Sequence, residues 1–180
     1  MTADLPAIRR VVTAEDVDGN SRIAEDAPAR SIRTVPERPG YRAVNVWRTT
    51  GSPANLFEKD SVAEHQGILP PSHGTVLRII DFPPEPKDPK ELKRRLDATF
   101  GGIYKDADHD QRDGKHPGMH RTVTVDYAIV LEGEIWAVMD QGETLLRAGD
   151  VLIQRGTNHA WANRSEKTAR IAFVLIDGTR

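Results

Sequence analysis

Polar and apolar residues alternate along residues 120–131, so that successive side chains fall on opposite faces of a predicted β-strand. One face is polar and carries His120, Thr122, Thr124 and Asp126. The other face is apolar and carries Val123, Val125, Tyr127, Ile129 and Leu131. This pattern predicts a strand that lines a polar cavity with one face and packs against a core with the other.

Short apolar runs follow this strand at close spacing, and polar or glycine-containing turns separate them. The predicted strands cover residues 134–139, 143–147, 151–154, 159–163 and 169–176. Short strands at this spacing are typical of an antiparallel sandwich or barrel.

The first half of the chain adds further strands. A hairpin is predicted from residues 8–13 and 21–24, because Asp18-Gly19-Asn20 between them has the residues of a tight turn. Residues 41–49 and 74–82 are two more predicted strands, and residues 27–40, which contain three prolines, are interpreted as an extended connector.

One helix is predicted after Asp88. Asp88 is a capping residue, Pro89 occupies the first helical position, and Glu91 completes the capping pattern. Apolar residues then recur at helical spacing up to Phe100, and Gly101-Gly102 is expected to end the helix.

A length of 180 residues fits one domain. We expect a single domain over residues 1–180, in which residues 1–102 supply N-terminal strands, the connector and a short helix. Residues 103–119 form a polar loop, and residues 120–177 form the core of the barrel.

Composition narrows the choice of partner. The net charge is −2 and no extended basic stretch occurs, so we expect neither nucleic acid nor an anionic membrane as a partner. The absence of cysteine excludes thiolate metal ligands, thiol nucleophiles and disulfides. No leader-like apolar segment begins the sequence and no apolar run reaches about 20 residues, so we expect a cytoplasmic protein.

Two motifs resemble those of the cupin superfamily, and the match covers about residues 116–177. The first cupin motif has two histidines one residue apart, then a glutamate and a glycine. Aligned on Gly133, it places His120 at the first histidine, Thr122 at the second and Asp126 at the glutamate.

The second motif is matched by a Gly-Asp turn, a glycine, a histidine and an asparagine. These residues are Gly149, Asp150, Gly156, His159 and Asn163. Gln154 stands where the family usually has proline. The resemblance implies an all-β fold: a cupin-type double-stranded β-helix, or jelly-roll barrel, with extra N-terminal strands and one or two short helices.

The resemblance also implies a site for one divalent metal ion, of Fe, Mn, Zn or Ni. His120, Asp126 and His159 would be the metal ligands, because two histidines and a carboxylate form a facial triad with open positions. Thr122 departs from the family at the fourth position. The alternative is a metal-free polar cavity in which threonine hydroxyls satisfy a buried His120–Asp126 pair.

Other residues near the motifs are candidates for the site. His116, on the loop before the strand, is the candidate general acid or base. The candidate pocket residues are Thr122, Thr124, Trp136, Trp161 and Asn163. Alternatives are a core position for Trp136 and a turn hydrogen bond for Asn163.

These observations favour a metal-dependent cupin enzyme that acts on a small substrate with a carbonyl or carboxylate group, by dehydration or decarboxylation. The alternatives are an Fe(II) dioxygenase and a non-catalytic, metal-free cupin that binds a small ligand. We also expect a homodimer, because cupins commonly pair through extra N-terminal strands.

Overall fold

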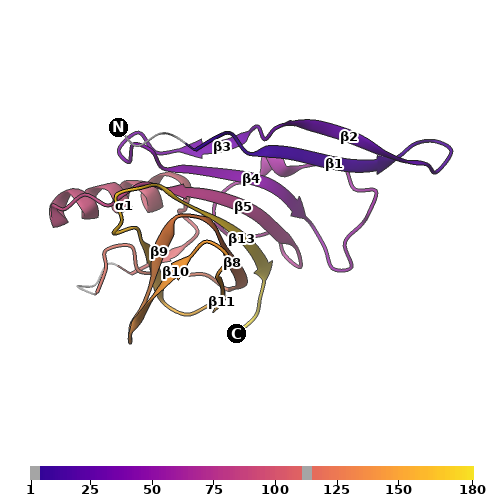
Figure 1. Cartoon of the computed structure of the whole chain (residues 1–180). Helices are drawn as coiled ribbons and strands as arrows, with labels where there is room; N and C mark the ends of the chain where they lie inside the picture. The colour runs from indigo at the N-terminus through magenta and orange to yellow at the C-terminus, as the bar shows by residue number, and fades with distance from the viewer. Residues whose placement is uncertain (1–4, 111–114) are drawn as a thin grey trace.

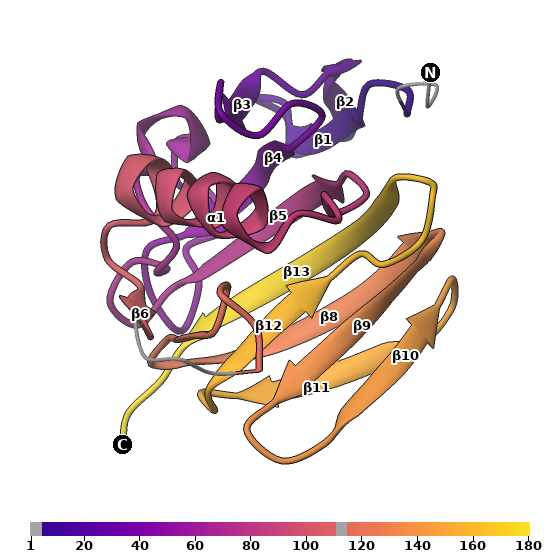
Figure 2. The same cartoon turned by 90° about the vertical axis from the view of Figure 1, so that its left-hand side faces the viewer.

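Two antiparallel sheets face each other in the computed structural model, which describes residues 5–110 and 115–180 (Figure 1, Figure 2). The five-stranded sheet has the order β10-β9-β12-β7-β6, with β10 at Glu143–Arg147, β9 at Glu134–Met139, β12 at His159–Ala162, β7 at His120–Arg121 and β6 at Asp108–His109. The six-stranded sheet has the order β11-β8-β13-β5-β4-β3, with β11 at Val151–Arg155, β8 at Thr124–Glu132, β13 at Ala169–Asp177, β5 at Thr75–Phe82, β4 at Arg42–Thr49 and β3 at Ser31–Thr34. The predicted all-β jelly roll is confirmed.

The N-terminal hairpin is also confirmed. β1 (Arg9–Glu15) and β2 (Ser21–Pro28) form a separate two-stranded sheet, which lies along β4 and extends beyond it in Figure 1. Gly19 in its turn has a φ of 81°, which only glycine adopts freely. The connector predicted at residues 27–40 is not wholly irregular, because β3 lies within it and pairs with β4.

The predicted helix is α1 (Pro89–Ile103), and Figure 2 shows it beside β5 at one edge of the two sheets. Its cap is as expected, since the Asp88 carboxylate accepts a hydrogen bond from the Lys90 N–H at 3.1 Å. The predicted end at Gly101-Gly102 is wrong, because the helix continues to Ile103. Phe100 and Ile103 pack against the core, and this packing outweighs the roughly 1 kcal/mol that each glycine costs a helix.

A second, single-turn helix of the 3-10 type covers Val62–Glu64. No helix in residues 5–110 and 115–180 is long and apolar enough to cross a membrane.

The strand predicted at residues 120–131 is interrupted. β7 pairs with β12 in the five-stranded sheet, whereas β8 pairs with β11 and β13 in the six-stranded sheet. The chain therefore passes from one sheet to the other at Thr122 and Val123. Alternation alone could not reveal this, because the buried and exposed positions keep their period of two across the break.

The predicted core face of this segment is also wrong. Val123, Tyr127 and Leu131 are 43%, 42% and 47% exposed, so they lie on the outer surface of the six-stranded sheet. The polar face points inward instead, and it continues into the fully buried Ala128 and Val130. The core of the barrel therefore begins where the polar residues end, on the same face of β8.

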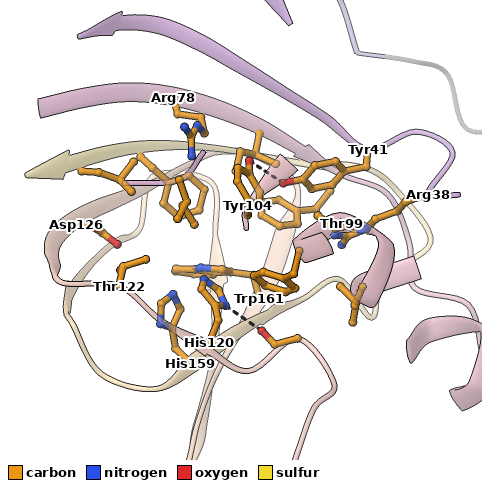
Figure 3. A pocket seen from close by; sticks show the side chains of 18 residues that line it. Arg38, Tyr41, Arg78, Thr99, Tyr104, His120, Thr122, Asp126, His159 and Trp161 are labelled. Carbon is orange, nitrogen blue, oxygen red and sulfur yellow. Dashed lines mark hydrogen bonds between the residues drawn. The ribbon is translucent and has the colours of Figure 1, made fainter. Parts of the chain in front are cut away.

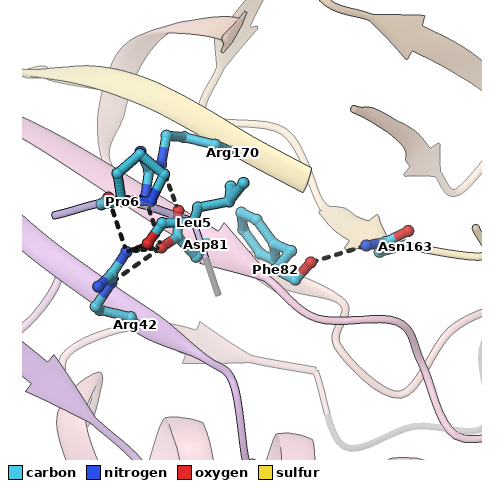
Figure 4. A network of polar contacts seen from close by, with 7 residues as sticks. All are labelled: Leu5, Pro6, Arg42, Asp81, Phe82, Asn163 and Arg170. Atoms are coloured by element: carbon cyan, nitrogen blue, oxygen red, sulfur yellow. Dashed lines mark hydrogen bonds and ion pairs between the residues drawn. The ribbon is translucent and has the colours of Figure 1, made fainter. Parts of the chain in front are cut away.

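A buried ion cluster attaches the N-terminal segment to the six-stranded sheet (Figure 4). Asp81 on β5 accepts hydrogen bonds from Arg42 on β4 and from Arg170 on β13, at 2.6–3.0 Å. The same two arginines donate to the carbonyl oxygens of Leu5 and Pro6. One carboxylate thus connects three neighbouring strands and fixes the segment that precedes β1.

Candidate functional site

A cavity of about 60 Å³ lies between the two sheets and α1 (Figure 3). Its walls are mostly apolar and include Ile68, Ile80, Phe82, Leu96, Phe100, Trp161, Phe173 and Leu175. The charged or titratable side chains that line it are Arg38, Tyr41, Arg78, Tyr104, His120, Asp126 and His159. An apolar cavity with a few converging polar groups is the usual form of a small-molecule site.

Two of the predicted site residues lie side by side in this cavity. His120 and His159 are directly opposite each other on β7 and β12, and their ring centroids are 4.3 Å apart. His120 Nδ1 lies 2.9 Å from the Gly118 carbonyl oxygen, and His159 Nδ1 lies 2.9 Å from the Thr157 carbonyl oxygen. A carbonyl can only accept, so each Nδ1 carries the proton and each neutral ring keeps Nε2 as an acceptor.

Both rings are neutral at physiological pH. Burial lowers the pKa of His120 to about 4, and a hydrogen bond to Gly118 only partly opposes this effect. Burial also lowers the pKa of His159 well below its ordinary value, and the neighbouring His120 lowers it further. The cavity therefore holds two imidazoles that can accept a proton or bind a metal ion through Nε2.

Asp126 lines the same cavity from β8, in the opposite sheet. Its Oδ1 is buried and has no hydrogen-bond partner among residues 5–110 and 115–180. Burial raises the pKa of this carboxyl to about 6, although a hydrogen bond from Thr124 and the charge of Arg78 both lower it. Asp126 therefore changes protonation state near neutral pH.

Thr122 and Thr124 are buried, and their hydroxyl oxygens are 2.7 Å apart in a mutual hydrogen bond. Thr122 lines the cavity, whereas Thr124 acts behind it, on Asp126. Thr122 thus stands where the cupin motif has its second histidine, and its hydroxyl is already hydrogen-bonded to Thr124.

The expected metal triad is not brought together as a set. His120 and His159 are adjacent, but no group of three His, Cys, Asp or Glu side chains in the described ranges lies close enough to hold a metal ion. The unpartnered Oδ1 of Asp126 and the two Nε2 atoms have suitable donor chemistry. Their placement on opposite sheets does not complete a three-ligand centre.

Sequence reasoning missed the polar residues that the segment between residues 38 and 104 contributes. The hydroxyls of Tyr41 and Tyr104 are 3.1 Å apart. The guanidinium of Arg38 lies 4.4 Å from the Tyr41 ring centroid, and that of Arg78 lies 5.1 Å from the Tyr104 ring centroid. No motif marks these four residues, because they meet only when the sheets and α1 pack together.

His116, the predicted general acid or base, is not among the residues that line the cavity. Its Nδ1 accepts a hydrogen bond from the Gly118 N–H at 3.1 Å, so the proton is on Nε2. Nε2 donates to the Glu85 carboxylate at 2.9 Å. Both ring nitrogens are engaged with protein groups, so His116 supports the turn that leads into His120.

The three remaining candidates differ in position. Trp161 lines the cavity and contacts both His159 and Phe173 edge-on. Trp136 does not line it, because the side chain lies on the other face of the five-stranded sheet, under Arg164.

Asn163 is not a pocket residue either. Its amide donates to the Phe82 and Lys167 carbonyl oxygens and accepts from Ser165, so it fixes the turn between β12 and β13 (Figure 4).

Sequence comparison finds relatives along almost the whole chain. The cupin-domain-containing oxidoreductase virC of Hypocrea virens is 33% identical over 186 residues, which cover 98% of this chain and 80% of that protein. The Phomopsin biosynthesis cluster protein C' of Diaporthe leptostromiformis is 32% identical over 186 residues, with 97% and 80% covered. The cupin-domain-containing oxidoreductase fogC of Aspergillus ruber is 27% identical, with 97% and 75% covered.

No family model matches the sequence. Among solved structures, a Cupin 2 conserved barrel domain protein from Salinispora arenicola aligns with a TM-score of 0.43 and 14% identity. The alignment covers 80% of this chain and 82% of that chain.

Proposed function

The chain belongs to the cupin superfamily, and from this premise we propose that it is an enzyme that acts on a small organic molecule bound in the cavity between its two sheets. One arrangement carries the proposal. The two neutral imidazoles of His120 and His159 share an apolar cavity with Asp126, whose pKa of about 6 lies near physiological pH. Titratable groups with strongly shifted pKa values in one cavity are typical of catalytic sites.

These groups suit proton transfer. The Nε2 of His120 or His159 would remove a proton from a carbon next to a carbonyl group, and protonated Asp126 would donate a hydrogen bond to the oxygen that gains negative charge. The apolar walls exclude water, which strengthens both interactions. Dehydration and decarboxylation of small carbonyl compounds are reactions that such an arrangement supports.

A divalent metal ion would be held by His120 and His159, and it would supply Lewis-acid chemistry at the substrate oxygen. In the described ranges no third His, Cys, Asp or Glu lies close enough to complete the ligand set with these two histidines. An oxidoreductase is the second candidate, since relatives of 27% and 33% identity carry that word in their names.

The test is deuterium incorporation, followed by proton NMR, from D₂O into acetophenone, phenylacetaldehyde and phenylpyruvate. The wild type is compared with His120→Gln and His159→Gln, and with His73→Asn as the matched control. His73 is an exposed loop histidine with a φ of 58°, which asparagine tolerates. Exchange in the wild type and the control that falls at least about tenfold in the cavity variants supports the proposal. Exchange at the buffer rate with every compound would contradict it.

Elemental analysis of the purified protein separates the two candidates. Stoichiometric iron that is lost in His159→Gln, together with oxygen consumption during turnover, would support the oxidoreductase and reject proton transfer. Deuterium exchange that survives a chelator, with no oxygen consumed, would reject the oxidoreductase.

A further inference from the structure

The buried residue Arg38 lines the cavity, and no acidic residue in the described part of the chain forms an ion pair with it. Arg38 is 6% exposed, and Figure 3 shows it reaching in from the side of Thr99. Among residues 5–110 and 115–180, its side chain makes no hydrogen bond and no ion pair. Its contacts are the ring faces of Tyr41 at 4.4 Å and Phe82 at 5.9 Å from the ring centroids.

The other buried arginines of residues 5–110 and 115–180 all have hydrogen-bond acceptors for their side chains. Arg10 donates to the carboxylates of Glu25 and Asp60, and Arg170 donates to Asp81. Arg78 donates to two neutral acceptors, the Asn45 side-chain oxygen at 2.7 Å and the Gly67 carbonyl at 2.8 Å. Arg38 differs from all three, because its donors are not used by the described protein groups.

The acids near the cavity do not neutralise Arg38 by contact. Glu85 is the acid that acts on Arg38 through space, but no ion pair joins the two and Glu85 accepts the Nε2–H of His116. Asp126 interacts with Arg78, whose charge lowers the pKa of the Asp126 carboxyl. A buried charged group whose N–H donors have no acceptor among the described protein groups is costly to the folded protein, so the retention of Arg38 points to a ligand.

We propose that Arg38 binds the carboxylate of a small organic acid whose apolar body lies against Phe82, Phe100 and Leu96. The inference rests on the proposed function, and it names the substrate class for that cavity. A guanidinium that stacks on an aromatic ring leaves its edge free, and that edge matches a carboxylate in a two-point hydrogen bond. The apolar walls of the cavity favour an acid with a hydrocarbon or aromatic body.

Isothermal titration calorimetry with matched pairs tests this assignment. The pairs are benzoate and benzamide, phenylacetate and phenylacetamide, and cyclohexanecarboxylate and its amide. In the wild type, at least one acid is expected to bind at least about tenfold more tightly than its amide. Arg38→Met is expected to remove this preference, because it removes the charge that distinguishes the acid from its amide. Arg22→Met, which removes an exposed arginine from β2, retains the preference.

The folded state of Arg38→Met is checked by thermal unfolding without ligand. Its melting temperature is expected to equal or exceed that of the wild type, because the substitution removes a buried charge that lacks an acidic partner. Arg38→Lys provides a second variant, which keeps the charge but loses the planar fork, and an intermediate preference is expected.

Three results would overturn the assignment: equal affinity for acids and amides in the wild type, an acid preference that persists in Arg38→Met, or no binding by any acid. The proposed function fails separately. Acid binding without any deuterium exchange would leave the role of Arg38 intact and reject proton-transfer chemistry. Deuterium exchange on neutral ketones without acid binding would support proton-transfer chemistry and reject the role of Arg38.

Discussion

His120 and His159 each donate the Nδ1–H to the carbonyl oxygen two residues earlier in the chain, and the two rings lie together on paired strands. The backbone therefore fixes the tautomer with the proton on Nδ1 in both histidines. Since a neutral imidazole has one proton, Nε2 of both rings is free to act as a base or as a metal ligand.

The protonation of this pair should appear in the pH dependence of stability. Unfolded histidines bind protons below pH 6.5, whereas native His120 does so only near pH 4, and burial also holds the pKa of native His159 well below 6.5. The unfolding free energy should therefore fall with decreasing pH, by up to about 1.4 kcal/mol per pH unit for each histidine. Urea unfolding at several pH values between 7 and about 4.5 measures this change. The unfolding free energy should fall less steeply with decreasing pH in the double variant His120→Gln/His159→Gln. Parallel slopes in both proteins would contradict the lowered pKa values.

The contribution of Asp126 to the unfolding free energy should depend on pH in the opposite direction. The native pKa of Asp126, about 6, is above the ordinary 3.8, so the buried carboxylate destabilises the fold at pH values above 6 and the effect disappears below 3.8. Asp126→Asn should raise the unfolding free energy at pH 8 by about 1–3 kcal/mol, and the gain should vanish near pH 4. Calorimetry at both pH values measures the difference. A loss of stability at pH 8 would show that the charge is compensated in the native protein.

Thr122 occupies the position at which the cupin motif has a second histidine, and it lines the same cavity as His120 and His159. Thr122→His should supply the third imidazole that the two existing rings lack. Cobalt(II) titration followed by visible absorption should show tighter binding in the variant than in the wild type, by at least about tenfold. Thr13→His, on the N-terminal hairpin, is the control and should bind as the wild type does. Equal binding by the wild type and Thr122→His would show that Asp126 or another group already completes the centre.

The Asp81 cluster predicts a large effect on stability. Asp81→Asn would leave the buried Arg170 and the partly buried Arg42 without an acid, at a cost of about 3–5 kcal/mol. Chemical denaturation measures the loss. Asp26→Asn, which removes the exposed partner of Arg9, should change stability by less than about 1 kcal/mol. Similar losses in the two variants would mean that the buried cluster contributes no more than a surface pair.

The homodimer also remains a prediction, and the outer surface of the six-stranded sheet offers a place for it. Tyr127 on β8 and Ile153 on β11 are paired residues, and they are 42% and 52% exposed. Exposed apolar side chains grouped on one sheet face favour association. Sedimentation should give twice the chain mass of 20.0 kDa, and Ile153→Lys should give the single-chain mass. A wild-type mass of 20.0 kDa would reject the dimer, and a dimer that persists in Ile153→Lys would place the interface elsewhere.

Local signals in the sequence were sufficient for most elements. The cap at Asp88 correctly placed the start of α1, and period-two alternation placed β9 and β10 at their observed bounds. Alternation also put His120 and Asp126 on one face. It could not show which face was interior, because the polar residues line a cavity and apolar residues such as Tyr127 remain exposed.

The remainder of the site depends on contacts between distant segments. Arg38 lies in the turn before β4, and 120 residues separate it from His159 although both line one cavity. Neither its neighbours nor its spacing distinguishes it from the exposed arginines of the chain. Its role depends on burial, which packing against Tyr41 and Phe82 determines.

The position of β13 has a consequence for biosynthesis. β13 lies between β8 and β5 in the six-stranded sheet, and it is translated after both. Before β13 leaves the ribosome, β3, β4 and β5 are one unfinished sheet fragment, β8 and β11 are another, and each exposes an unpaired strand edge. Ordering of the cavity must wait for this strand, since it also supplies Phe173 and Leu175 to the cavity wall. Nascent chains that stall before β13 should therefore depend on chaperones more than the finished protein does.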